Sequence, residues 1–316
     1  MIEVKHLVKR YGDKLAVNDL SFTVQAGEIL GFLGPNGAGK STTMNVLTGY
    51  LSATSGEVWI DGVDMAEEPE RAKKKIGYLP EIPPLYTDMT VEEYLRFVFR
   101  LKKVGRDVNR EAHIAEICEQ VYLRDVRGRL IRNLSKGYRQ RVGIAQAMIG
   151  NPKILILDEP TVGLDPKQIL EVRSLIRSLR EKHTILLSSH ILQEIQAVCT
   201  RILIINEGRL AADEREAERR DRYQILVEGP KRRVAASLGQ LPGVQSVRPF
   251  GEAEPGVVRY QLTVEPGCPV RRAVFDRVSQ SGWRLLGLEQ SRESLEERFL
   301  LATSGQRIPG GREEEL

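Results

Sequence analysis

No segment of the 316 residues is long and apolar enough to cross a bilayer, since crossing takes roughly 18 to 20 uninterrupted apolar residues. The N-terminus, MIEVKHLVKRYGDK, also lacks the apolar stretch of a secretory signal. The sequence therefore predicts a chain that is neither inserted into a membrane nor secreted.

Cysteine is scarce as well. Cys118, Cys199 and Cys268 are far apart, odd in number and form no CxxC pair, which argues against a disulfide framework or a zinc site. An excess of one charge is also missing, because 47 basic and 43 acidic residues give a net charge of only +4. Such a near-balance of charge gives little support to nucleic-acid binding, and we expect no nucleic-acid partner.

The first two thirds of the chain alternate short apolar runs with helical patterns, which is typical of an α/β fold with a sheet covered by helices. Several runs are apolar throughout and suit burial on both faces, so they predict a parallel core. Strands are expected at residues 2–7, 21–24, 28–33, 57–60, 75–79, 154–157, 184–188 and 201–205. Helical periodicity replaces them from about 88 to 150, where Thr90 is expected to cap a helix ahead of Glu93.

A charge-dense run, Ala212–Arg222, is expected to be a solvated helix or linker that ends a first domain of residues 1–211. Beyond it, a small α+β domain is expected at 223–303, with a last helix at Ser294–Ala302 and a flexible tail at 304–316. Its elements follow the split βαβ, ferredoxin-like order. They are a strand at 223–227, a helix at 231–238, strands at 244–248 and 258–264, a helix at 270–279 and a strand at 284–289.

A phosphate-binding loop is predicted by the motif GxxxxGK[ST], which here follows the apolar run EILGFL and opens the helical run STTMNVLTGYL. Its glycines let backbone N–H groups surround a polyphosphate at a helix N-terminus. Lys40 would contact the β- and γ-phosphates, and the Ser41 hydroxyl would coordinate Mg²⁺. The expected ATP-binding residues of the loop are Gly34, Pro35, Asn36, Gly37, Ala38, Gly39, Lys40, Ser41 and Thr42.

Two carboxylates, Asp158 and Glu159, end the apolar strand at 154–157. Charges at the end of a buried strand are costly unless an ion or a substrate uses them. Asp158 suits Mg²⁺, and Glu159 suits polarisation of an attacking water. An apolar run followed by Asp-Glu is common on its own. It indicates a catalytic site here because the chain also contains the phosphate-binding loop.

With these motifs in order, residues 1 to about 210 resemble the ATP-binding subunits of ABC transporters, within the P-loop NTPases. The segment LSKGY at 134–138 resembles the family signature LSGGQ, although Lys136 and Tyr138 depart from it. The resemblance implies that Ser135 and Gly137 contact ATP held by the other subunit of a homodimer or of a pair of such subunits. Ser135 is also a good N-cap, and a helix start attracts phosphate.

The resemblance also implies roles for single residues elsewhere. Asp165 would link the two sites of the dimer, His190 would act in catalysis at the γ-phosphate, and Tyr11 would stack on adenine. From the residues alone, His190 could instead cap or pack, and Tyr11 could equally be a half-buried strand tyrosine. Glu81 stands where the family usually has glutamine, and its carboxylate could ligate Mg²⁺ or water.

The family resemblance implies an ATPase at the cytoplasmic face of the inner membrane that drives a separately encoded integral membrane permease. The segment Ile82–Thr90 would receive that permease. The combination YLPE, MTVEEYL and LSKGYRQR resembles the gliding-motility and natural-resistance type exporters. Two alternatives stay open, a non-transport ABC ATPase acting on a macromolecular complex and a nucleotide-sensing module with feeble turnover.

Overall fold

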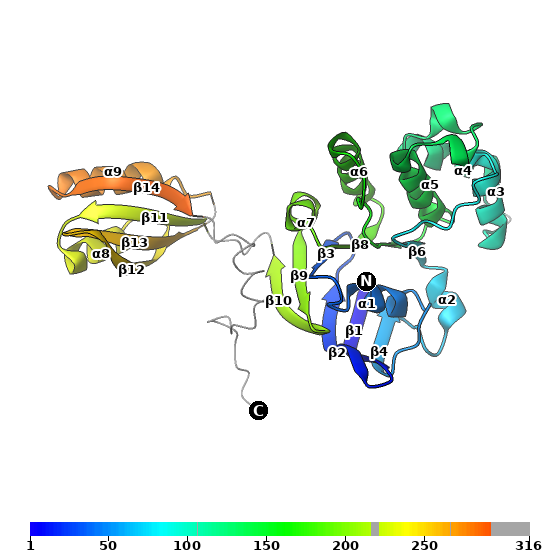
Figure 1. The fold of residues 1–316 in the computed structure, drawn as a ribbon, viewed down its shortest axis with the longest axis horizontal. Coiled ribbons are helices and arrows are strands. Elements are labelled where there is room, and N and C mark those ends of the chain that lie inside the picture. Colours follow the sequence, from blue (N-terminus) through cyan, green and yellow to red (C-terminus); the bar gives the residue numbers. More distant parts are fainter. Residues whose placement is uncertain (106, 216–220, 266, 292–316) are drawn as a thin grey trace. The chain divides into compact units, whose positions relative to one another are not determined.

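The computed structural model describes the chain except for residues 106, 216–220, 266 and 292–316 (Figure 1). The chain divides into two compact units, Met1–Asp213 and Glu214–Leu316. The expected helix at Ser294–Ala302 and the expected tail at 304–316 lie outside the described residues. Among the described helices, none combines the length and the apolar character that crossing a membrane requires.

A parallel sheet forms the centre of the first unit, in the order β10-β9-β3-β8-β7-β6. Neighbouring strands from β9 to β6 are parallel, and the side chains of β3, β7 and β8 are buried throughout, which confirms the predicted parallel core. The strands are β3 (Ile29–Leu33), β6 (Ile76–Leu79), β7 (Ile154–Leu157), β8 (Thr184–Ser189), β9 (Arg201–Asn206) and β10 (Arg209–Arg215).

Parallel strands end at one edge of their sheet, and ligands of α/β proteins bind at that edge. The phosphate loop follows β3, Glu81 follows β6, Asp158 and Glu159 follow β7, and His190 follows β8. The fold therefore brings four sequence-distant segments to one place.

A second, antiparallel sheet has the order β2-β1-β4-β5. Its strands are β1 (Ile2–Tyr11), β2 (Lys14–Val24), β4 (Ser55–Ile60) and β5 (Val63–Asp64). The strand expected at 21–24 begins seven residues earlier, at Lys14, because it pairs with β1 as far as Tyr11. Pairing with a neighbour fixes this end, since Asn18 and Asp19 interrupt the apolar pattern before Ser21.

Helices of the first unit flank the parallel sheet or form the expected helical insertion, in which α3, α4 and α5 group together (Figure 1). They are α1 (Lys40–Leu47), α2 (Pro69–Lys73), α3 (Val91–Leu101), α4 (Arg110–Gln120), the 3-10 turns η1 (Arg124–Val126) and η2 (Ile131–Asn133), α5 (Lys136–Met148), α6 (Pro166–Leu179) and α7 (Leu192–Val198).

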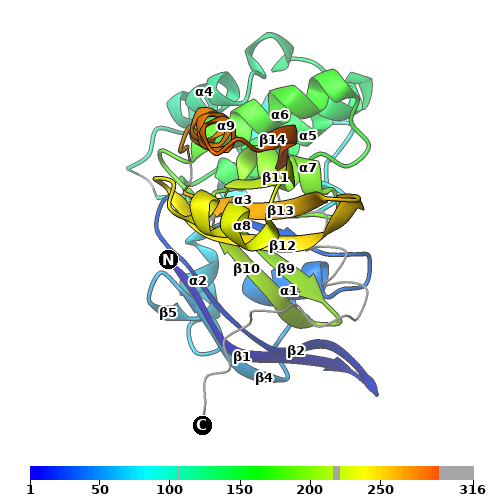
Figure 2. The ribbon, with the colours of Figure 1, turned by 90° about the vertical axis from the view of Figure 1, so that its left-hand side faces the viewer.

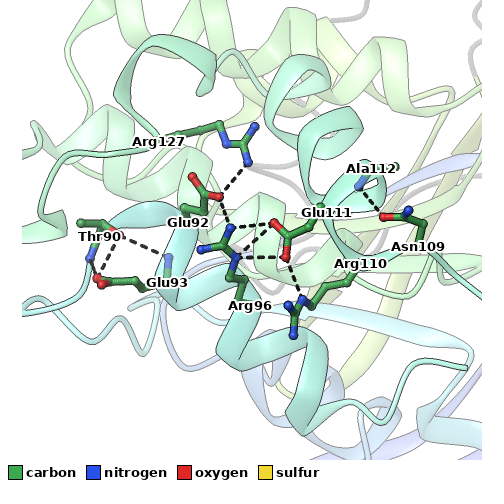
Figure 3. Close-up of polar contacts among 9 residues, drawn as sticks. All are labelled: Thr90, Glu92, Glu93, Arg96, Asn109, Arg110, Glu111, Ala112 and Arg127. Atoms are coloured by element: carbon green, nitrogen blue, oxygen red, sulfur yellow. Dashed lines mark hydrogen bonds and ion pairs between the residues drawn. The ribbon is translucent and has the colours of Figure 1, made fainter. Parts of the chain in front are cut away.

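The predicted cap of α3 is confirmed, since Glu93 N–H donates to Thr90 Oγ1 and Glu93 Oε2 accepts from Thr90 N–H at 2.8 Å. Figure 3 shows this capping box beside an ion-pair network. Arg96 bridges Glu92 of its own helix and Glu111 of α4, at 2.5 and 2.7 Å. The network fastens the two helices to each other.

The second unit, seen in Figure 2, contains a four-stranded antiparallel sheet in the order β12-β13-β11-β14 with an apolar core shared by α8 and α9. This is the order of a split βαβ fold. Its elements are β11 (Asp221–Glu228), α8 (Lys231–Gly239), β12 (Val244–Glu254), β13 (Val257–Val264), α9 (Val270–Gln280) and β14 (Arg284–Ser291).

The expected helix or linker at 212–222 needs correction at both ends. β10 continues to Arg215, and β11 begins at Asp221, where Asp221 and Arg222 pair with Val264 and Thr263. Backbone hydrogen bonds form this ladder whatever the charge of the side chains, so a charged run can be strand. Residues 216–220, inside the same run, lie outside the described part.

Candidate functional site

The phosphate loop joins β3 to α1, which begins at Lys40. Gly37 and Gly39 have φ angles of 82° and 105°, in the region that favours glycine. A Cβ on Gly39 would lie 2.5 Å from the Ala16 carbonyl oxygen, and one on Gly34 would lie 2.3 Å from that of Ile205. The glycines are therefore needed for the loop to pack as closely as it does.

Lys40 is the cation of this loop, and its side chain is buried, with the residue 6% exposed. Its ammonium donates to the carbonyl oxygens of Gly34 at 2.7 Å and Pro35 at 3.2 Å. Burial lowers the pKa of Lys40, although the nearby Glu159, Asp158 and Glu81 act in the opposite direction. An anion at this position would offset the cost of burying the ammonium.

Asp158 stands at the end of β7 and faces the loop. The Ser188 hydroxyl donates to Asp158 Oδ1, and Ser41 Oγ lies 3.5 Å from the same oxygen. A hydroxyl and a carboxylate are the oxygen ligands that Mg²⁺ accepts beside substrate phosphates, so these two residues fit that ion. Within the described residues no three His, Cys, Asp or Glu side chains gather around a metal position.

Glu159 and His190 form a pair across the ends of β7 and β8. His190 Nδ1 lies 3.0 Å from Glu159 Oε2, and Glu159 N–H donates to Ser188 Oγ at 2.9 Å. Glu159 has a φ of 47°, a left-handed conformation that a non-glycine residue keeps only when its surroundings hold it there. The carboxylate is thus held beside the imidazole.

A cavity of about 400 Å³ joins these groups, a size within the range of small-molecule sites. Ten of the predicted site residues line it, namely Tyr11, Asn36, Gly37, Gly39, Lys40, Ser41, Thr42, Glu81, Glu159 and His190. Gly34, Pro35, Ala38 and Asp158 lie beside it without forming its wall.

Sequence reasoning missed four residues here. Lys14, Ala16 and Val162 line the cavity, and Ser188 bonds both Asp158 and Glu159. Ser188 had a usable signal, because a serine that is buried near the end of a strand needs a hydrogen-bond partner. Lys14 and Ala16 had none, since only the pairing of β1 with β2 brings them near the loop.

Ser135, Gly137 and Asp165 do not line the cavity. Ser135 caps α5 by accepting from Tyr138 N–H at 3.4 Å, and Asp165 caps α6 by accepting from Gln168 N–H at 2.9 Å. Ser135 is exposed, so its hydroxyl and the start of α5 are open to a ligand from outside this chain.

Comparisons with known proteins agree with this geometry. Residues 17–162 match the family model described as ABC transporter. An uncharacterized ABC transporter ATP-binding protein of Bacillus subtilis, YxlF, is 32% identical over 302 residues, covering 95% of this chain and 98% of that protein. The lipopolysaccharide export system ATP-binding protein LptB of Escherichia coli is 36% identical over 214 residues, covering 67% of this chain and 89% of that protein.

Among solved structures, the chain is similar to a dimeric post-hydrolysis state of an ATP-binding cassette bound to ADP and Pi. The TM-score is 0.62 at 26% identity, with 68% of this chain and 98% of that chain covered. The likeness covers a share of the chain equal in size to the first unit, whereas the match to the Bacillus subtilis protein is long enough to include much of the second.

Proposed function

Because this chain belongs to the ATP-binding proteins of ABC transporters, we propose that it powers export through a permease carried on a separate chain. The chain is an ATP hydrolase, as its family is. The observation that carries the proposal is a cavity in which the phosphate loop meets the Glu159–His190 pair.

In the proposed mechanism Lys40 exchanges its two loop carbonyls for the β- and γ-phosphate oxygens of ATP, and backbone N–H groups of the loop donate to the same phosphates. Tyr11, at the cavity wall, stacks on adenine. Ser41 and Asp158 would hold Mg²⁺, which neutralises charge on the phosphates. Glu81, also at the wall, would reach the ion or its water.

Glu159 polarises the attacking water, a role that contributes about 10²- to 10⁴-fold in rate. His190 Nδ1, 3.0 Å from Glu159 Oε2, donates its proton to that oxygen when the ring is in the Nδ1–H tautomer. The Nε2 atom then carries the lone pair that can accept from a water or hydroxyl group. The contact therefore fixes the orientation of both the base and the imidazole ring.

Two copies complete the site in this proposal. The exposed Ser135 and the start of α5, with Gly137, would contact the γ-phosphate bound by the partner, and Asp165 would lie between the two sites. A related cassette is dimeric with ADP and Pi bound, which supports a pair of subunits here. A homodimer or a pair with a similar subunit would serve equally.

The permease would dock on the loop between β6 and α3. Ile82 is 82% exposed and Tyr86 is 54% exposed, although both are apolar enough to favour burial. We place the chain peripherally at the cytoplasmic face of a bacterial inner membrane. LptB, a relative, is named for an export system, and YLPE with LSKGYRQR supports the gliding-motility and natural-resistance branch.

Affinity purification from membranes tests the transport part. The tagged chain should recover a protein with several membrane spans, and Ile82→Asp should reduce that recovery strongly by placing a charge on the docking loop. Leu101→Asp, a change at another exposed aliphatic residue, is the matched control and should leave recovery unchanged. Recovery of ribosomes or DNA alone would contradict the proposal.

A further inference from the structure

We propose that Glu194 is a positioning residue that holds the segment carrying Glu159 against the segment carrying His190. The inference rests on the roles proposed above for that pair. Glu194 lies in the first turn of α7, is 6% exposed and does not line the cavity. It has no contact with the space where substrate would bind.

One oxygen of Glu194 receives both side-chain hydrogen bonds of this junction. The hydroxyl of Thr161 donates to Glu194 Oε2, and the hydroxyl of Ser189 donates to the same oxygen at 3.3 Å. Thr161 lies two residues beyond Glu159, and Ser189 immediately precedes His190. The carboxylate therefore joins the segment after β7 to the end of β8.

Backbone groups extend this junction toward the reacting pair. The Ser189 hydroxyl also accepts from Ile191 N–H at 3.0 Å, which fixes the chain on both sides of His190. On the other side, Val162 N–H donates to the Glu159 carbonyl at 3.2 Å, closing the turn that contains Thr161. Glu159 sits in this turn with its left-handed backbone, a conformation that depends on such external support.

Packing alone gives no reason for a carboxyl group at this position. A buried polar group is costly unless it is hydrogen-bonded, and an apolar side chain would fill the same space without that cost. Glu194 is instead surrounded by two hydroxyl donors from the two segments whose separation sets the 3.0 Å contact between His190 and Glu159. Its position suits control of that distance.

The first test is the effect of Glu194→Ala on ATP turnover. We expect kcat to fall about 10- to 100-fold, because small misplacements of a reacting group cost that much, while KM for ATP stays within about twofold. Glu194→Gln should keep most of the rate, because its amide oxygen can accept from both hydroxyls. Gln193→Ala, at the exposed neighbour on α7, is the matched control and should leave kcat within about twofold.

Thr161→Val tests the same contact from the other side and keeps the side-chain volume. We expect a fall in kcat similar to that of Glu194→Ala, and no further fall when the two changes are combined, because both remove one junction. Thermal unfolding of each variant shows whether it is folded. If Glu194→Ala does not fold, Glu194→Gln and Thr161→Val still test the proposal.

Three results would overturn the inference: a folded Glu194→Ala with normal kcat, a raised KM at unchanged kcat, or equal losses in Glu194→Gln and Glu194→Ala. Glu159→Gln, measured in the same assay, distinguishes a failure of the inference about Glu194 from a failure of the proposed function. Normal turnover in Glu159→Gln would remove the role assigned to Glu159. A loss there beside normal Glu194→Ala would contradict only the role of Glu194.

Discussion

The two units of the chain bury different kinds of side chain. The first unit buries charged and hydroxyl groups at the carboxyl ends of its parallel strands, including Lys40, Asp158, Glu159, Ser188 and Glu194. In the described residues of the second unit no charged side chain is buried, and the core is made of aliphatic residues and tyrosine rings.

This difference shows which part of the molecule contains destabilising features. Burying a polar group lowers stability unless hydrogen bonds compensate for the lost water, and a left-handed Glu159 adds strain. The first unit carries both costs beside the cavity, and it buries further polar side chains elsewhere, such as Arg141, His183 and Arg201. Its buried polar residues should therefore affect chemistry more than folding, and the apolar core of the second unit should do the reverse.

Lys40→Met tests the first half of this comparison through a large effect on ATP binding. ATP affinity should fall about 10- to 100-fold, because charge-assisted hydrogen bonds contribute about 1.5–3 kcal/mol. Thermal stability should hold or rise, since burial disfavours the ammonium. Calorimetric titration measures the affinity, and Lys182→Met at an exposed site is the control. Unchanged ATP affinity in Lys40→Met would contradict the claim that the buried polar residues of the first unit serve the chemistry.

Leu262→Ala tests the second half. Leu262 is fully buried in the core of the second unit, so its truncation should destabilise that unit by about 2–5 kcal/mol. ATP turnover of the folded protein should stay within about twofold. Urea unfolding gives the stability, with Leu286→Ala, at an exposed leucine of β14, as the matched control. A large loss of turnover would show that the second unit takes part in hydrolysis.

Thr90→Ala should have a smaller effect, confined to the stability of the first unit. It removes one half of the capping box at the start of α3, which costs about 1 kcal/mol. The midpoint of urea unfolding would register this loss. Thr87→Ala, at an exposed threonine three residues earlier, should leave the midpoint in place. Equal midpoints for both variants would mean that the cap adds nothing to folding.

Asp61→Asn should have the smallest effect, and one that depends on pH. The ammonium groups of Lys75 and then Lys153 lower the pKa of Asp61 to about 2, from an ordinary value of 3.8. Because the folded state binds this proton less readily than the unfolded one, the contribution is full above pH 3.8 and is lost as the pH falls toward 2.

The difference in unfolding free energy between wild type and Asp61→Asn should thus be about 1 kcal/mol or less at neutral pH and should shrink below pH 3.8. Urea unfolding at a series of pH values measures it. A difference that grows on acidification would have the wrong sign and would contradict the ion pairs as the cause.

The parts that sequence could predict are those fixed by local chemistry. A polyphosphate needs glycines, a lysine and a hydroxyl at set spacing, and a buried strand that ends in Asp158 and Glu159 is readable from its residues alone. The capping box at Thr90 is equally local. These features combine short-range spacing with a clear change in polarity.

What could not be predicted depends on contacts between distant residues. Glu194 bonds Thr161 across 33 positions, and nothing near either residue indicates the other. The early start of β2 at Lys14 and the strand ends inside the charged run at 212–222 follow from backbone pairing with neighbours. The left-handed φ of Glu159 likewise leaves no trace in composition, because glutamate rarely adopts it.

The most direct test of the central claim is ATP turnover and association of Glu159→Gln. The account predicts that this variant binds ATP as tightly as wild type, hydrolyses it about 10²- to 10⁴-fold more slowly and accumulates as an ATP-bound dimer. Light scattering with and without ATP, together with phosphate release, measures both properties. Wild-type turnover in Glu159→Gln would contradict the claim that the cavity beside His190 is where ATP is hydrolysed.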